Sequence, residues 1–144
     1  MNLPFDDPIR LQAKSGNDTL QISGRYLHSR YDPVKEADKW VNSLNIVDGD
    51  TVILIEPGIN YSGSVILNRF DNCRVAGIHV TRQLHETDSS NCLSWYGSNN
   101  TSLNSFLTGV LTGTDLTRLK IFVWPAAEGI FSEWCSSIKN QIIA

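Results

Sequence analysis

The sequence has no long hydrophobic run and no excess of positive charge. None of its apolar stretches approaches the roughly 20 residues that a membrane-spanning helix needs. The amino-terminal segment MNLPFDDPIR is acidic, whereas a secretory signal would be basic and then apolar. The formal net charge of -3 provides no broad basic surface for a phosphate backbone. We therefore expect a cytoplasmic protein whose partners include neither a membrane nor a nucleic acid.

Cysteine is scarce, and its spacing argues against two common uses. Cys73, Cys92 and Cys135 form no C-x-x-C pair and show no metal-ligand spacing to a histidine. Their odd number argues against a disulfide framework. We expect buried free thiols and no metal site.

The length of the chain favours a single domain. With 144 residues, of which 41% are hydrophobic, the chain can form one ordinary core but hardly two. We expect one domain over residues 1–144, with an irregular arm over 1–10, a β-hairpin over 11–27 and an α/β core over 28–144. The hairpin is predicted because apolar and polar residues alternate on either side of a Gly-Asn-Asp turn that begins at Gly16.

The stretch from residue 51 to 80 has the pattern of a βαβ unit. Thr51 to Ile55 is a short apolar, β-branched run that stops at a Pro-Gly pair, as a strand buried on both faces does. Asn60 or Ser62 could then cap a helix, and a second apolar run follows from Arg74 to Val80. The spacing predicts two parallel strands joined by one helix.

Further helices and strands alternate along the rest of the chain. Asp32-Pro33 is a strong helix start, and the apolar stripe behind it predicts a helix as far as Asn45. The remaining expected elements are a polar loop over 81–90, a strand over 92–96, a helix over 101–111, a strand over 119–124 and a closing helix over 127–143. This alternation predicts the α/β class, as a Rossmann-like three-layer sandwich with a mainly parallel sheet and an amino-terminal β-hairpin.

Candidate ligand-binding residues lie where these strands lead into helices, because open α/β sheets bind ligands at their carboxyl edge. The candidates are His28, Ser29, Arg30, Tyr31, Glu56, Gly58, Asn60, Tyr61, Gly63 and His79. The order of strand, glycine turn and helix start suits a nucleotide or nucleotide-sugar. However, the turn lacks both G-x-G-x-x-G and Gly-Lys-Ser/Thr, and Ile78 to Val80 provides no carboxylate for a ribose. Glycines that serve only turn geometry and close packing are the competing interpretation.

Two polar residues have alternative roles. Asp32 is either a helix cap or a charged functional group, and the Asp-Pro start favours the cap. Glu56 is either a general base or a hydrogen-bond acceptor for a neighbouring turn. Ser29 and His28 are not a catalytic pair, because adjacent side chains on an extended segment point to opposite faces. We assign no catalytic residue.

Three phrases give the chain a resemblance to a known family. Leu27-His-Ser-Arg-Tyr-Asp-Pro33 with Glu36-Ala37, the turn Ile55-Glu-Pro-Gly58 and the pair Trp124-Pro125 occur in the family's order. Together they resemble the amino-terminal domain of the family that joins motility-associated glycosyltransferases, which modify flagellins, to the archaeal 6-hydroxymethylpterin diphosphokinases. In that family a second Rossmann-like domain holds the catalytic core and opens with Gly-Pro-Ser-Leu, a phrase that this sequence does not contain.

The resemblance implies a non-catalytic amino-terminal module that packs against a downstream catalytic domain or a second copy, or helps to shape a substrate cleft. The alternative is a small-molecule enzyme of methyltransferase-like or nucleotide-sugar-binding type that uses the turn at Gly58. The absence of a ribose carboxylate and of a phosphate-binding lysine favours the module. No cofactor is expected for the module, and a nucleotide-type ligand is expected for the enzyme.

Overall fold

The stretch over residues 51–80 folds as the parallel unit that its pattern predicts. The structure is a computed structural model that describes residues 6–143. Strand β4 (Thr51–Ile55) leads through helix α2 (Tyr61–Arg69) to β5 (Arg74–His79), and the two strands pair in parallel. All five residues of β4 are buried, which explains their unbroken apolar run.

Four parallel strands form the main sheet, in the order β6-β5-β4-β7. Strand β6 (Leu93–Tyr96) pairs with β5, and β7 (Leu119–Val123) pairs with β4. The sheet confirms the predicted α/β class and its three parallel strands over 51–56, 74–80 and 119–124.

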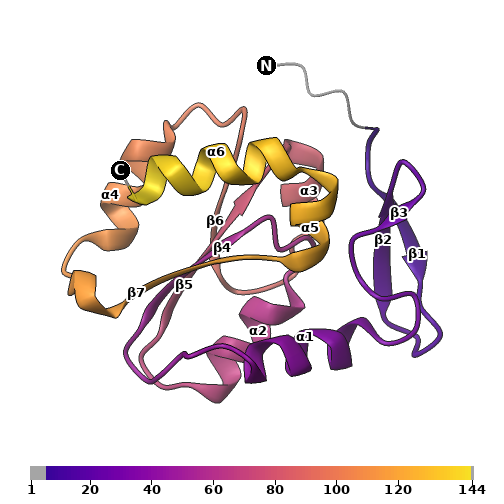
Figure 1. Ribbon diagram of the computed structural model, residues 1–144, viewed down its shortest axis with the longest axis horizontal. Helices are drawn as coiled ribbons and strands as arrows, with labels where there is room; N and C mark the ends of the chain where they lie inside the picture. The colour runs from indigo at the N-terminus through magenta and orange to yellow at the C-terminus, as the bar shows by residue number, and fades with distance from the viewer. Residues whose placement is uncertain (1–5, 144) are drawn as a thin grey trace.

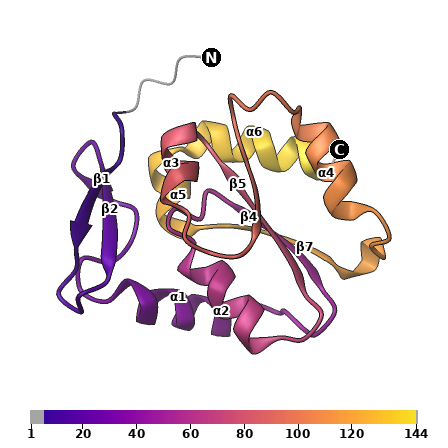
Figure 2. The same ribbon diagram turned by 180° about the vertical axis from the view of Figure 1, so that it is seen from behind.

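Helices cover both faces of this sheet (Figures 1 and 2). On one face, α1 (Pro33–Asn42) and α2 pack through Val41 and Ile66 against Val52 and Leu54. On the other face lie α3 (Arg82–Thr87), α4 (Leu103–Leu111), α5 (Pro125–Ile130) and α6 (Ser132–Ile143). Alternate residues of β4 enter the two clusters, as strand geometry requires. The architecture is therefore a Rossmann-like sandwich of three layers.

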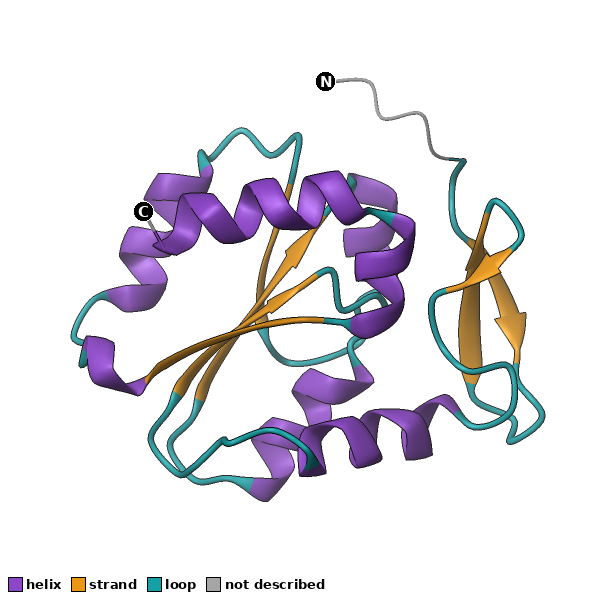
Figure 3. Ribbon diagram, in the orientation of Figure 1, coloured by secondary structure: helices purple, strands orange, loops and turns teal. Residues whose placement is uncertain are grey.

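The amino-terminal sheet has three antiparallel strands, whereas two were predicted. They are β1 (Ile9–Gln12), β2 (Asp18–Ile22) and β3 (Arg25–Tyr26), in that spatial order. Ile9 and Arg10 belong to β1, so the expected arm over 1–10 is too long; residues 1–5 lie outside the described part. Figure 3 shows this sheet beside the end of the molecule at which α1 begins. Tyr61 Oη donates to the Asp18 carbonyl over 2.7 Å and so joins it to α2.

Two helix predictions need correction. The expected polar loop over 81–90 contains α3, because the Thr81 hydroxyl accepts from Leu84 N and the Leu84 side chain is buried. The expected helix over 127–143 is two helices, since Phe131 leaves helical geometry with φ −122° and ψ 42° and is buried in the core. A single buried apolar residue in a polar segment gives too weak a periodic signal to predict a short helix.

Helix boundaries also differ slightly from prediction. Helix α1 ends at Asn42, three residues before the expected end at Asn45, and Ser43 caps it. Helix α4 begins at Leu103, where the Ser102 hydroxyl accepts from Ser105 N. A short 3₁₀ turn, η1 (Leu116–Arg118), precedes β7. No helix within residues 6–143 is long and apolar enough to cross a bilayer.

Replacing the cap of α1 tests the role of Asp32. Its Oδ1 accepts from Lys35 N over 3.0 Å, and Pro33 occupies the first helical position. We expect Asp32→Ala to lower the free energy of unfolding by about 1 kcal/mol and Asp32→Asn to lower it much less, since asparagine caps about as well. Urea unfolding measures both. Equal losses for the two variants would show that the negative charge, and not the cap, stabilises this site.

Candidate functional site

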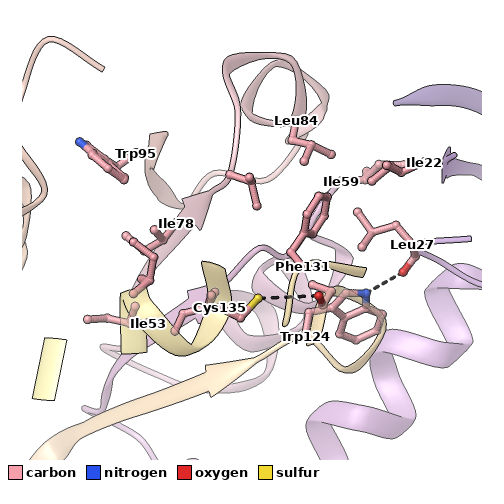
Figure 4. Packing of buried hydrophobic residues seen from close by; sticks show 14 of the residues in the cluster. Ile22, Leu27, Ile53, Ile59, Ile78, Leu84, Trp95, Trp124, Phe131 and Cys135 are labelled. Atoms are coloured by element: carbon pink, nitrogen blue, oxygen red, sulfur yellow. Dashed lines mark hydrogen bonds between the residues drawn. The ribbon is translucent and has the colours of Figure 1, made fainter. Parts of the chain in front are cut away.

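Three segments that are far apart in the sequence meet beside the carboxyl edge of the main sheet. Trp124 Nε1 donates to the Leu27 carbonyl over 2.7 Å, as Figure 4 shows, and Ile59 N donates to His28 Nε2 over 3.0 Å. The rings of His28 and Trp124 lie 5.6 Å apart. These segments belong to the three phrases that carry the family resemblance, or directly follow one of them, so those phrases form one contact network.

Gly58 makes room for His28. The glycine has φ +61°, and a Cβ built on it would lie 2.4 Å from His28 Nε2 and 2.7 Å from Leu27 Cδ2. Only a residue without a side chain fits at this approach and adopts the left-handed backbone at little cost. The side chains of Leu27 and His28 therefore fill the space beside the turn at Gly58.

His28 is a neutral, buried side chain. It is 3% exposed, and burial lowers its pKa to about 3. Because Nε2 accepts a hydrogen bond, the neutral ring carries its proton on Nδ1, which has no hydrogen-bond partner among residues 6–143. The ring also contacts Tyr61 edge-on at 5.5 Å. His28 thus cannot supply positive charge to an anionic ligand near pH 7.

Glu56, His79 and Asp88 form a buried chain of charges. Glu56 Oε2 lies 2.9 Å from His79 Nδ1, and Asp88 Oδ2 lies 2.9 Å from His79 Nε2. Glu56 also accepts from Gly58 N over 3.0 Å and from Val80 N over 2.8 Å. Its backbone is left-handed, with φ 44°, which is unusual for a residue with a side chain. The carboxylate of Glu56 therefore holds the turn to the end of β5.

His79 is a protonated imidazolium in this chain of charges. Burial alone lowers its pKa, but the charge of Glu56 and hydrogen bonds to Asp88 and Glu56 outweigh burial and raise the pKa to about 9. For Asp88, burial has the opposite effect and raises the pKa, but hydrogen bonds from His79 and Ser90 bring this pKa below its ordinary value. Both ring nitrogens donate to carboxylates, so His79 has no free lone pair with which to act as a base.

Asn60, Tyr61 and Gly63 build the start of α2. Asn60 Oδ1 accepts from Gly63 N over 2.9 Å, and its Nδ2 donates to Asp88 over 3.2 Å. A Cβ on Gly63 would lie 2.6 Å from Asn60 Oδ1 and from Cys92 Sγ. Of the two predicted caps, Asn60 is the one used. The space at the helix start is thus filled by the side chains of Asn60 and Cys92.

Arg30 and Tyr31 lie apart from this network. The Ser29 hydroxyl accepts from Tyr31 N and Asp32 N, so it stabilises the turn that leads into α1. Arg30 and Tyr31 instead line a cavity of about 380 Å³ beside the amino-terminal sheet. Lys14 Nζ lies 5.2 Å, and Arg30 Cζ 4.9 Å, from the centre of the Tyr31 ring. Apart from Ser29, the predicted candidates therefore divide into a buried network and an exposed cationic cavity.

Sequence reasoning missed Asp88, Ser90 and Lys14. Asp88 lies in the segment predicted as a polar loop, and Ser90 donates to it through both its amide and its hydroxyl. A carboxylate nine residues after a buried histidine has no characteristic local spacing, and only the fold of α3 brings the two together.

All three cysteines are free; Cys135 is buried and the other two are half-buried. Among residues 6–143, no group of three or more His, Cys, Asp or Glu side chains is arranged so that it could hold a metal ion.

No protein-family model matches the chain, and a search of curated proteins finds no significant match.

Proposed function

We propose that this chain is a non-catalytic, Rossmann-like amino-terminal module of a glycosyltransferase-like protein, in which it supports the substrate cleft or packs against a partner domain. The observation that carries the proposal is the state of the carboxyl edge. There Glu56 and His79 bond to each other and to neighbouring groups, and His28 fills the space beside Gly58. A ligand at this edge would have to break buried, charge-assisted hydrogen bonds, which are costly to lose.

The class of protein that we propose, a glycosyltransferase-like protein, comes from the resemblance of three sequence phrases to a known family. Its three phrases are held together by contacts of Leu27, His28, Gly58 and Trp124, so their joint presence has a structural reason. Because these contacts stabilise the structure, a chain could contain all three phrases without being an enzyme.

The reading frame downstream of residue 144 is the first test. We expect it to encode a Gly-Pro-Ser-Leu phrase at the start of a second domain. In that longer protein, Glu56→Gln should leave the turnover of folded enzyme unchanged, since a general base typically contributes about 100-fold or more. A reading frame without the phrase, or a Glu56→Gln variant that is folded and inactive, would contradict the proposal.

A second candidate function is binding of an anionic small molecule such as a nucleotide-sugar, at the cavity beside the amino-terminal sheet. Lys14 and Arg30 place two positive charges there, and Tyr26 and Tyr31 add aromatic surface; Gln12, Ala13 and Thr19 complete the lining. None of the residues within 6–143 that line the cavity is acidic. Two cations beside aromatic rings suit a phosphate attached to a planar base. This location differs from the turn at Gly58 that the sequence favours for the same ligand class.

Titration calorimetry with UDP-glucose tests this second function. If the cavity binds the nucleotide-sugar, Arg30→Gln should raise the Kd about tenfold or more, because a charge-assisted hydrogen bond contributes about 1.5–3 kcal/mol. Lys35→Gln, an exposed lysine on α1, is the matched control and should leave the Kd unchanged. Adenosylmethionine, which carries a positive sulfonium, should not bind. Equal binding by wild type and Arg30→Gln, with loss in Gly58→Val, would place the ligand at the turn instead.

A further inference from the structure

We propose that Tyr26 binds the base of a nucleotide in the cavity beside the amino-terminal sheet, so that this cavity selects nucleoside diphosphates over inorganic pyrophosphate. This role of Tyr26 rests on the second candidate function, the binding of a nucleotide-sugar at the same cavity. The two tyrosines that line the cavity then have separate tasks. Tyr31 holds the cations Lys14 and Arg30, which bind the phosphates, and Tyr26 offers its ring to the base.

Backbone hydrogen bonds hold the two cations side by side. Lys14 N donates to the Arg30 carbonyl over 3.0 Å, and Ser15 N donates to the Tyr31 carbonyl over 2.8 Å. These bonds join the turn between β1 and β2 to the segment that leads into α1. The backbone positions of Lys14 and Arg30 are therefore fixed before a ligand arrives, which lowers the entropy cost of binding.

Tyr31 positions the side chains of these cations. Arg30 Nη2 donates to Tyr31 Oη over 2.7 Å. Lys14 Nζ and Arg30 Cζ both lie over the Tyr31 ring, within the roughly 6 Å at which an aromatic face attracts a cation. The hydroxyl and the ring of Tyr31 thus already have partners within the protein. Tyr31 is therefore a positioning residue for the two positive charges.

Two carboxylates near these cations in the sequence have other partners. Asp18 Oδ2 lies 2.8 Å from Arg10 Nε, and Asp32 Oδ1 accepts from Lys35 N at the start of α1. Neither aspartate lines the cavity. The two positive charges beside Tyr31 are therefore available to an anion, and a diphosphate offers them several charged oxygens as acceptors.

Tyr26, in contrast, has a free ring. It is 36% exposed, and within residues 6–143 its hydroxyl makes no hydrogen bond and its ring contacts no other ring or cation. It pairs with Gln21, so it lies on the sheet face opposite to the buried Leu20. Stacking on a base needs an accessible aromatic face and no particular hydrogen bond. Tyr26 meets this requirement.

The arrangement of the cavity also suits a nucleotide. Tyr26 and Arg30 line it from the same segment of the chain, and Lys14 lines it beside Arg30. In a nucleoside diphosphate a ribose separates the base from the phosphates, so the two groups need neighbouring contact areas in one cavity. Its volume of about 380 Å³ lies within the roughly 300–1,000 Å³ that is usual for small-molecule sites.

Titration calorimetry with UDP and with inorganic pyrophosphate tests the role of Tyr26. We expect the wild type to bind UDP more tightly than pyrophosphate. Tyr26→Ala should raise the Kd for UDP about tenfold, the usual effect of removing one aromatic platform, and should leave the Kd for pyrophosphate unchanged. Tyr26→Phe keeps the ring and should restore the tight binding of UDP. Circular dichroism melts verify that each variant is folded.

Variants of the cationic group separate the role of Tyr26 from the site itself. Arg30→Gln should raise the Kd for UDP and for pyrophosphate by the same factor, and Tyr31→Phe, which removes the hydroxyl that holds Arg30, should also weaken both. If Arg30→Gln weakens both compounds while Tyr26→Ala changes neither, or weakens both equally, the role of Tyr26 is wrong and the cavity still binds anions. If the wild type binds neither compound, or Arg30→Gln changes neither Kd, the second candidate function is wrong and the role of Tyr26 falls with it.

Discussion

Replacing His79 with glutamine should lower the free energy of unfolding by about 3–5 kcal/mol, the usual cost of removing one partner from a buried charge pair. The imidazolium is fully buried between Glu56 and Asp88, and each of its nitrogens lies 2.9 Å from a carboxylate oxygen. Without it, two buried carboxylates face each other with no positive charge between them. Because ordinary domains have only about 5–15 kcal/mol of stability, this loss is a large part of the total.

The same histidine should make stability depend on pH in the alkaline range. The pKa of His79 is about 9 in the folded protein, against 6.5 for the free side chain. A raised pKa means that the stabilisation is fully present below about pH 6.5 and is lost as pH rises through about 9. The shift corresponds to about 3 kcal/mol, at 1.36 kcal/mol per pKa unit. The difference in unfolding free energy between wild type and His79→Gln should therefore shrink by about this amount between pH 6.5 and pH 10.

His85 provides the matched control for both measurements. Its ring centre lies 5.7 Å from that of His79 and 4.8 Å from that of Tyr96. The residue is half-buried, and its Nε2 lies 2.8 Å from the Ser94 hydroxyl and not beside a carboxylate. His85→Gln should cost about 1 kcal/mol, the usual net value of one hydrogen bond. Urea unfolding across the pH range measures all three proteins. A His79→Gln variant that loses no more stability than His85→Gln, or a difference that does not change with pH, would show that His79 is not the charged centre of this network.

Gly58→Ala should lower the free energy of unfolding by about 2–5 kcal/mol. The left-handed backbone costs an alanine about 1–2 kcal/mol, and forcing a methyl group against packed side chains costs typically 1–3 kcal/mol. The new Cβ would lie 2.4 Å from His28 Nε2, so the imidazole must move and its hydrogen bond from Ile59 N must weaken.

Gly113→Ala separates the two causes. Gly113 also has a positive φ, +75°, but a Cβ built there meets nothing within 4 Å. It should show the backbone cost alone. A double-mutant cycle with His28→Ala adds a second check, because removing the imidazole should recover part of the loss caused by Gly58→Ala. Equal losses at Gly58 and Gly113, with no coupling to His28, would mean that His28 does not fill the space beside the turn.

Together these predictions distinguish a structural network from a catalytic one. Glu56, His79 and Gly58 should affect stability strongly. In the longer protein that we propose, they should have little effect on the turnover of the molecules that remain folded. The ligand site that we propose as the second candidate function lies elsewhere, at the cavity of Lys14 and Arg30.

The main elements of this fold could be predicted from local pattern. Strand β4 is an unbroken apolar run, Asp32 and Pro33 start α1, and Gly58 interrupts the chain between β4 and α2. Each of these signals acts within a few residues: burial on both faces requires apolar side chains in sequence, and a cap or a glycine works through its own backbone. The segment between β4 and β5 has the length of one crossover helix. Their parallel pairing could therefore also be predicted from the sequence.

The partners of the candidate residues depended on the tertiary structure. Glu56, His79 and Asp88 lie in three different segments, and only the pairing of β4 with β5 and the short helix α3 bring their side chains to 2.9 Å. His28 meets Gly58 because Trp124, almost 100 residues away, holds Leu27 in place. No fixed spacing in the sequence marks such contacts. In a parallel crossover, a whole helix or strand of the chain lies between residues that become neighbours in space. A nucleotide turn and a filled structural turn therefore look alike in the sequence, and the buried imidazole of His28 distinguishes them.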